Sequence, residues 1–214
     1  LVCILVDVCT VSRMNVVFIR LILLGGFVLK RVVIGLLGVF LGLNIRAYAS
    51  ENQLGFVNVI GDVPEYRYDA MVENYMLVPE NIRESFQLDG WTLSITTENL
   101  EDTWFRGWGV GSIASGIDSD LKEIRVESTK NGTSAVVHEM GHYVDWKLGN
   151  ISSTYEWKNI WKQETVSKYG STSSLEGFAE AFEQLYYNED SFKKNYPSSY
   201  EFIKSHIGEV GSID

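Results

Sequence analysis

Two histidines and a glutamate form the most informative motif in the chain. Residues 136–142 contain the pattern H-E-x-x-H, with His138, Glu139 and His142 at its defining positions. On a helix, residues four apart share a face, so both imidazoles can bind one zinc ion. Glu139 would then lie beside the open metal position, where it can take a proton from a zinc-bound water and pass it to a leaving amine. The alternative is an ordinary helix that buries a pair of histidines.

A third metal ligand must come from elsewhere in the sequence. The longer pattern that adds a third histidine is absent, because Asp145 and Leu148 replace the required Gly and His. The remaining histidine, His206, is expected on the surface of a terminal helix. Glu176 and Glu180 lie one turn apart on a later predicted helix. One of them could bind the metal while the other hydrogen-bonds a ligating histidine.

Two of these acids have competing explanations. Ser173-x-x-Glu176 is also a capping box, in which the glutamate reaches back to the Ser173 amide. Spacing alone therefore does not choose between Glu176 and Glu180 as the ligand. Asp145 shares a helix face with both histidines, and it is either an acid that supports the site or a solvated surface carboxylate.

The elements that must position these residues follow from hydrophobic periodicity. Apolar residues three and four apart predict helices over about 133–148, 154–168 and 174–187, and Pro197 begins a last helix that ends near 207. Thr133 or Ser134 is expected to cap the first of them. Earlier helices are predicted within 64–86 and over 79–87, and strands over 91–97, 107–116 and 121–128. The order is N-terminal helices, a small twisted sheet, an active-site helix and C-terminal helices, which is an α+β fold.

Two stretches resemble a known family. Residues 138–145 (HEMGHYVD) and 169–182 (YGSTSSLEGFAEAF) are similar to the anthrax lethal factor-like zinc metallopeptidases, including the small secreted Pro-Pro endopeptidases of Gram-positive bacteria. The resemblance is strongest over 133–187 and extends from about residue 65. It implies a zincin-like fold, Glu176 as the third ligand and Glu180 as the partner of a ligating histidine. It also implies that Tyr169 is catalytic, as a donor to the oxyanion; without it, Tyr169 is a tyrosine packed at a helix end.

The first 49 residues have the features of a targeting segment. Lys30-Arg31 precede the apolar run 32–43, and Ala47-Tyr-Ala49 is an A-x-A cleavage site. This predicts a signal peptide over 28–49, with cleavage after Ala49, and one domain over 50–214. The doubtful apolar segment 1–27 is either a membrane-anchored hairpin or over-extended translation. It contains the only cysteines, Cys3 and Cys9, so the mature domain has neither disulfides nor cysteine ligands.

The net negative charge limits the kinds of molecule that the protein can bind. The formal net charge is −10, but residues 1–49 hold five of the 18 basic residues and one of the 28 acidic ones, which leaves −14 on the remainder. So acidic a surface repels phosphate backbones, which excludes nucleic acid as a partner. After signal cleavage we expect no stable membrane contact, and we expect a monomer.

These features together predict a secreted zinc endopeptidase. Its substrate would be a polypeptide in extended conformation, added to the sheet edge along 109–116, with Trp104, Phe105 and Trp108 as candidate walls of the cleft. Cleavage at Pro-Pro bonds of surface or extracellular proteins is implied only by the resemblance. The alternative is a toxin-like or adhesin-like binding module that keeps the fold without turnover.

Overall fold

The computed structural model describes residues 2–11, 14–23, 56–106 and 113–210. The chain divides into two compact units, Leu1–Asn52 and Gln53–Asp214. In the first unit, β1 (Val2–Val11) and β2 (Met14–Leu23) pair as antiparallel strands. The expected signal peptide over 28–49 and its cleavage site lie outside the described residues. Within the described ranges, no helix combines the length and the apolar character needed to cross a membrane.

The second unit contains a mixed four-stranded sheet. Its strands are β3 (Val57–Ile60), β4 (Thr92–Thr96), β5 (Ser115–Asp118) and β6 (Glu123–Glu127), in the order β3-β4-β6-β5. The first three neighbours run parallel, whereas β5 is antiparallel to β6 and forms one edge. The apolar residues of the central strands alternate and are buried, namely Leu93, Ile95, Ile124 and Val126, and the polar Ser94 and Thr96 between them in β4 are buried as well. The alternation of apolar residues places the apolar side chains of both strands on one face of the sheet.

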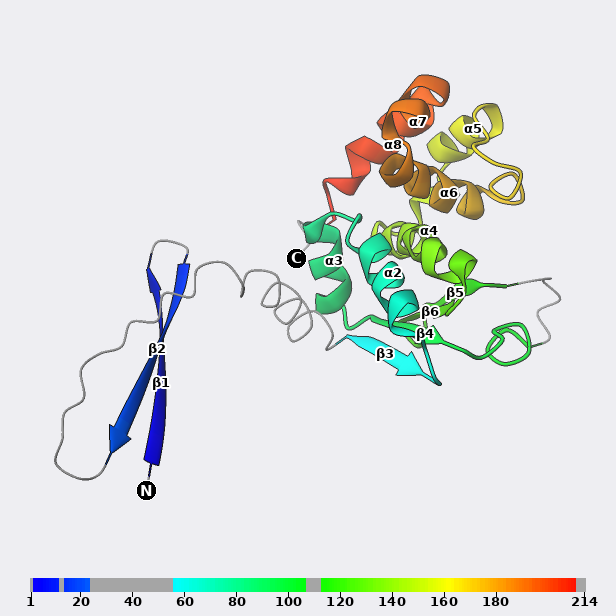
Figure 1. Ribbon diagram of the computed structural model, residues 1–214. Coiled ribbons are helices and arrows are strands. Elements are labelled where there is room, and N and C mark those ends of the chain that lie inside the picture. Colours follow the sequence, from blue (N-terminus) through cyan, green and yellow to red (C-terminus); the bar gives the residue numbers. More distant parts are fainter. Residues whose placement is uncertain (1, 12–13, 24–55, 107–112, 211–214) are drawn as a thin grey trace. The chain divides into compact units, whose positions relative to one another are not determined.

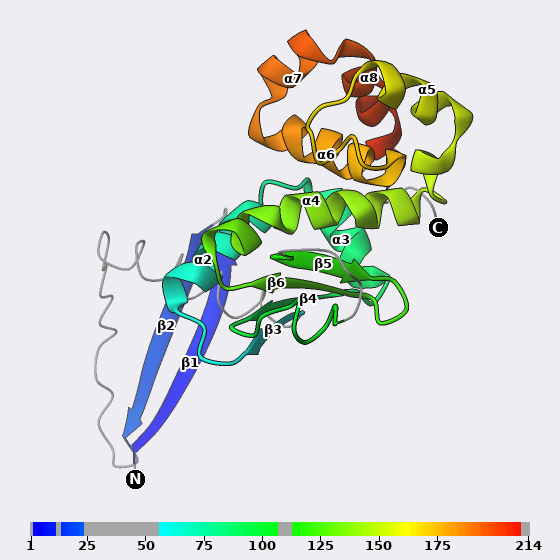
Figure 2. The ribbon, with the colours of Figure 1, turned by 90° about the vertical axis from the view of Figure 1, so that its right-hand side faces the viewer.

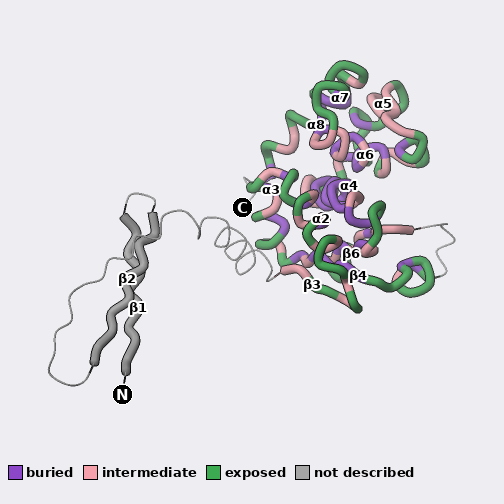
Figure 3. The backbone as a smooth tube through the Cα atoms, in the orientation of Figure 1, coloured by how far each residue is buried: buried purple, intermediate pink, exposed green. Residues whose placement is uncertain are grey.

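A long helix lies at the centre of this unit. The helices are α2 (Glu65–Tyr75), α3 (Glu80–Leu88), α4 (Lys130–Lys147), α5 (Tyr155–Gln163), α6 (Ser174–Tyr187), α7 (Glu189–Asn195) and α8 (Pro197–Ile207), with a 3₁₀ helix η1 (Ile151–Ser153) after α4 (Figure 1). Helix α4 runs between the sheet and the layer formed by α5 to α8 (Figure 2). It is buried over most of its length (Figure 3). Side chains on α4 can therefore meet the sheet as well as α6.

The start of α4 is fixed against the sheet. The Thr129 hydroxyl accepts a hydrogen bond from the Gly132 amide at 3.0 Å, so Thr129 is the N-cap. The prediction of Thr133 or Ser134 as the cap is wrong by about one turn. A side chain at Gly132 would collide with the main-chain oxygens of Glu127 and Ala114. Glycine lets the helix begin directly against β6, which brings the motif close to the sheet edge.

The α+β architecture is confirmed, with differences in individual elements. Helices α6 and α8 match their predicted bounds, whereas α5 ends at Gln163 rather than near 168. The predicted strand 107–116 overlaps β5 only at its end, and residues 107–112 of it lie outside the described residues. Neither β3 nor α7 was predicted, because each is short and lacks a clear apolar period.

Candidate metal centre

The two motif histidines lie together on the inner face of α4. Their ring centroids are 4.8 Å apart, and His138 and His142 are 7% and 9% exposed. They are one helical turn apart, which the i, i+4 spacing dictates. Both rings therefore present nitrogens to the same neighbour, helix α6.

Small residues bring α4 and α6 into close contact. Gly141 lies between the two histidines in sequence, and a Cβ placed on it would be 2.9 Å from Ala179 Cα on α6. Ala179 in turn lies between Glu176 and Glu180. The two pairs of functional side chains flank this close contact, so the carboxylates can reach the imidazoles.

Glu176 completes a set of three candidate metal ligands. Its Oε2 lies 3.1 Å from His138 Nε2 and 3.4 Å from His142 Nε2. The ligand atoms of these three residues all lie within 4.8 Å of one another. Ser173 Oγ accepts a hydrogen bond from the Glu176 amide at 3.1 Å, so Ser173 caps α6. The Glu176 carboxylate is turned toward the histidines, and so only half of the predicted capping box is formed.

Glu180 lies on the other side of the first histidine. Its Oε1 is 3.2 Å from His138 Nδ1, whereas Glu176 faces Nε2 of the same ring. A histidine that binds a metal through one nitrogen commonly donates the other N–H to a carboxylate, which fixes the ring. The two glutamates that spacing left equivalent are therefore distinguished by the imidazole nitrogen that each one faces.

The ionisation of this cluster follows from its charges. Burial alone would lower the pKa of His138, but hydrogen bonds to the Glu176 and Glu180 carboxylates raise it to about 10. For Glu176, burial opposes ionisation, but the hydrogen bonds to His138 and His142 hold its pKa well below the usual range. A cation bound at this position would take the place of the imidazolium proton, since a histidine ligand must be neutral.

Two further side chains complete the surroundings of the motif. Glu139 is 4% exposed, and its Oε1 accepts a hydrogen bond from Ser115 Oγ at 2.7 Å. The Tyr169 ring lies 5.8 Å from the His138 ring, between centroids, and is 55% exposed. Partial burial of the phenol and the nearby Glu176 carboxylate raise the pKa of Tyr169. The phenol therefore stays protonated, as a hydrogen-bond donor must.

Asp145 and His206 do not belong to the group of candidate metal ligands. Asp145 is 1% exposed and accepts hydrogen bonds from the Ser152 amide and hydroxyl, at 2.6 and 2.9 Å. It anchors η1 to α4, so the alternative of a solvated surface carboxylate is wrong. His206 lies on α8 and its Nδ1 is 2.8 Å from the Phe202 carbonyl oxygen, apart from the cluster.

Sequence reasoning missed Ser115 and Glu183. Glu183 forms a second cluster with His138 and Glu180, and burial raises its pKa to about 7. The spacing of Glu176, Glu180 and Glu183 along one helix face could have revealed it. No sequence signal marked Ser115, since a serine in a predicted strand is ordinary.

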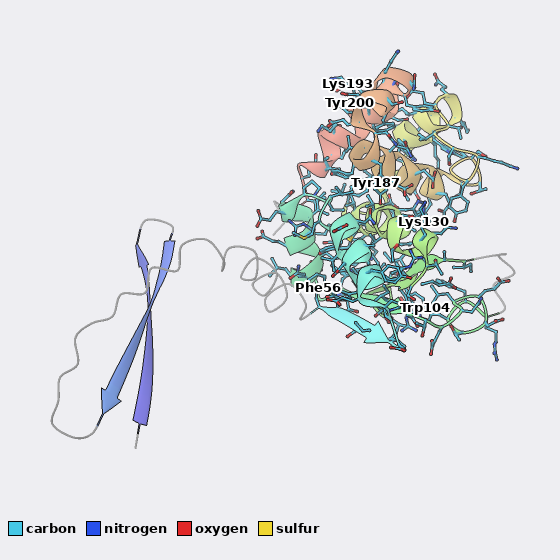
Figure 4. All side chains as sticks on the ribbon, viewed as in Figure 1. Phe56, Trp104, Lys130, Tyr187, Lys193 and Tyr200 are labelled. Atoms are coloured by element: carbon cyan, nitrogen blue, oxygen red, sulfur yellow. The ribbon has the colours of Figure 1, made fainter. Side chains whose placement is uncertain are left out.

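The aromatic residues expected to wall the cleft pack elsewhere. A side chain at Gly116 would overlap the ring of Phe105, so Phe105 lies directly against this residue of β5. Trp104, labelled in Figure 4, stacks on the Arg125 guanidinium with 4.6 Å from Cζ to the ring centroid. Successive residues of a strand face opposite sides, so Ser115 faces α4 whereas Gly116 and Phe105 are on the opposite face. Trp108 lies outside the described residues.

The donor set suits a catalytic metal. Two imidazoles and one carboxylate leave a position open in a four-coordinate site, and this combination is typical of hydrolytic zinc. The fit rests on Glu176, whose carboxylate points at both histidines although a capping position was available to it.

Comparisons with known proteins agree with this arrangement. The fold, with its central motif helix between a small sheet and the C-terminal helices, is that of zincin-like metallopeptidases. Residues 92–206 match the family "Anthrax toxin lethal factor, N- and C-terminal domain", and the chain belongs to this family. It is also similar in structure to the Pro-Pro endopeptidase PPEP-2 from Paenibacillus alvei. That match has a TM-score of 0.58 at 22% identity and covers 70% of this chain and 96% of the other. No curated protein matches the chain.

Proposed function

We propose that this chain is a secreted zinc endopeptidase. The observation that carries the proposal is the convergence of His138, His142 and Glu176, with ligand atoms within 4.8 Å, beside the buried carboxylate of Glu139. Glu180 would hold His138 through Nδ1. When bound, the metal would supply Lewis acidity to the water and to the scissile carbonyl.

The side chains of the chain have distinct roles in this reaction. Glu139 takes a proton from the attacking water as the water oxygen bonds to the carbonyl carbon. It then delivers that proton to the leaving amine as the C–N bond breaks. Tyr169 donates a hydrogen bond to the oxyanion that develops on the carbonyl oxygen.

The substrate is a polypeptide bound in an extended conformation. Strand β5 forms the sheet edge next to α4, and its Ser115 touches Glu139. A peptide that adds to this edge as a further strand would lie beside the strand that contacts Glu139. We propose cleavage at Pro-Pro bonds, which the structural similarity to a Pro-Pro endopeptidase supports.

Export would precede activity. We propose that cleavage after Ala49 releases a mature domain over 50–214 that acts outside the cell as a monomer. The compact unit that contains the site begins at Gln53, close to that position.

The test is cleavage of a peptide library that includes Pro-Pro sequences, by the purified chain with and without a chelator. Wild-type protein should cleave, lose activity with chelator and regain it with zinc. Glu139→Gln should keep stoichiometric zinc and lose about 10²–10⁴-fold in kcat, because it removes the proton acceptor and no ligand. Chelator-resistant cleavage, or near-native turnover by Glu139→Gln, would overturn the proposal. Metal binding without turnover by wild-type protein would favour the binding-module alternative instead.

A further inference from the structure

A hydroxyl group from the edge strand holds the proposed general base. Ser115 is the first residue of β5, and its Oγ donates to Glu139 Oε1 at 2.7 Å. Glu139 itself is almost fully buried on α4. The bond joins β5 to α4 at the proposed proton acceptor and restrains the position of one oxygen of its carboxylate.

The main chain of the same serine faces the open edge of the sheet. The Ala114 carbonyl accepts a hydrogen bond from the Glu127 amide at 2.8 Å, so Ala114 pairs inward with the strand next to it. In an antiparallel ladder, neighbouring residues direct their N–H and C=O groups to opposite sides. Ser115, which lies opposite Val126, therefore directs its own N–H and C=O away from β6. The strand order leaves that side of β5 without a neighbouring strand in the described residues.

The face of β5 that points away from α4 packs against an aromatic ring. Gly116 has the ring of Phe105 directly against it, in a space that any side chain would fill. This contact limits movement of the strand away from α4. An added peptide strand would thus pair with a backbone whose position is already fixed.

We propose that Ser115 is a positioning residue that couples substrate pairing at the sheet edge to the orientation of Glu139. Its main chain binds the substrate backbone while its hydroxyl holds the base toward the scissile bond. This inference rests on the proposed endopeptidase activity and adds a role for a residue outside the H-E-x-x-H motif.

Removal of the hydroxyl tests the link to the base. Ser115→Ala should lower kcat by about 10–100-fold, as loss of a supporting hydrogen bond does, and leave zinc content unchanged. KM should stay within about twofold, because the main-chain groups remain. Ser115→Thr keeps a hydroxyl and should recover most of the lost kcat. Ser94→Ala is the matched control, since Ser94 also donates to a carboxylate, Glu123, but within the sheet and away from the motif; its kcat should equal that of wild type.

Removal of the amide tests the link to the substrate. Proline is tolerated at the first residue of a strand and on an edge, so Ser115→Pro should fold while it lacks the outward N–H. In the inactive Glu139→Gln background, calorimetry should show weaker binding of an uncleaved substrate peptide for Ser115→Pro than for Ser115→Ala. Glu139→Gln protein with Ser115→Ala should bind the peptide as tightly as Glu139→Gln protein that keeps Ser115, because both retain the outward N–H.

The outcomes separate this inference from the proposed function. Cleavage by wild-type protein together with wild-type kcat in Ser115→Ala would overturn the role of Ser115 and leave the endopeptidase intact. Equal peptide binding by the Pro and Ala variants would also overturn it. Absence of any cleavage by wild-type protein would overturn both.

Discussion

At the scale of single residues, the site depends on which nitrogen each glutamate faces. Glu176 approaches Nε2 of His138 and of His142, whereas Glu180 approaches only Nδ1 of His138. A metal bound to both histidines through Nε2 would have Glu176 as its third ligand. Glu180 would then act through His138, by a hydrogen bond that sets the ring.

The two glutamates should therefore respond differently to the same substitution. Glu176→Gln should lose most zinc affinity, because it replaces a ligand carboxylate with a neutral amide. Glu180→Gln should bind zinc about 10–100-fold more weakly than wild type, as expected for a group behind a ligand. Zinc titration against a chromophoric chelator measures both. Wild-type affinity in Glu176→Gln, beside lost affinity in Glu180→Gln, would reverse the assignment.

At the scale of elements, the contact between α4 and α6 sets the metal geometry. Gly141 and Ala179 allow the approach, and a Cβ on Gly141 would be 2.9 Å from the Ala179 Cα. Glycine has a lower helix propensity than larger residues, so Gly141 lowers the intrinsic stability of α4. Its place in the helix is explained by the close packing of α4 against α6.

A large side chain at Gly141 should separate the two helices. Gly141→Leu should lower the free energy of unfolding by about 1–3 kcal/mol through overpacking. It should also weaken zinc binding by more than about tenfold, because ligand geometry depends on this spacing. Gly208→Leu is the control, since nothing lies within 4 Å of that position. Denaturation and zinc titration measure the two effects, and unchanged zinc affinity in a folded Gly141→Leu protein would contradict the argument.

A second element-level prediction concerns the start of α8. The side chain of Tyr196, the N-cap residue, makes no capping hydrogen bond. Instead, the Glu164 carboxylate accepts hydrogen bonds from the amides of Ser198 and Ser199 at 3.1 and 2.8 Å. Burial of Glu164 opposes ionisation, but these hydrogen bonds lower its pKa from the ordinary value. A carboxylate whose pKa is lower in the folded state stabilises the fold above its unfolded pKa. That contribution disappears as the pH falls through the folded pKa.

Glu164→Gln should accordingly be less stable than wild type at pH 7, by about 1 kcal/mol, which is the size of a helix cap. The difference should shrink as the pH is lowered below about 4. Glu84→Gln, an exposed position in α3, serves as the control and should match wild type throughout. Urea denaturation from pH 7 to pH 3 measures the difference, and a gap independent of pH would contradict it.

The same elements show what sequence can predict. The bounds of α6 follow from Ser173 as cap and from apolar residues such as Phe178 and Phe182 on one face. Local periodicity and capping determine these bounds, so they can be predicted from the sequence. The link from Glu164 to α8 and the bond from Ser115 to Glu139 depend on which elements meet in space. Such contacts between distant segments have no local signature.

At the scale of the whole molecule, the site lies between two layers of the second unit. The sheet lies on one side of α4 and the C-terminal helices lie on the other (Figure 2). The Tyr187 hydroxyl on α6 also donates hydrogen bonds to Asn74 of α2 and to the Ser134 carbonyl of α4 (Figure 4). The proposed ligands come from α4 and α6. A metal bound there would join the centre of the unit to its C-terminal layer, so its binding should stabilise the entire unit.

Metal removal should therefore lower the unfolding temperature of the protein. A ligand at about 100 times its Kd stabilises the folded state by about 2.7 kcal/mol. For a unit of this size, each kcal/mol corresponds to about 2–4 °C, so excess chelator should lower Tm by roughly 5–10 °C. Scanning calorimetry with and without chelator measures the shift. Glu139→Gln should show the same shift, since it is not a ligand, whereas His142→Ala should show almost none. A wild-type Tm that is insensitive to chelator, or a full shift in His142→Ala, would contradict a metal held between α4 and α6.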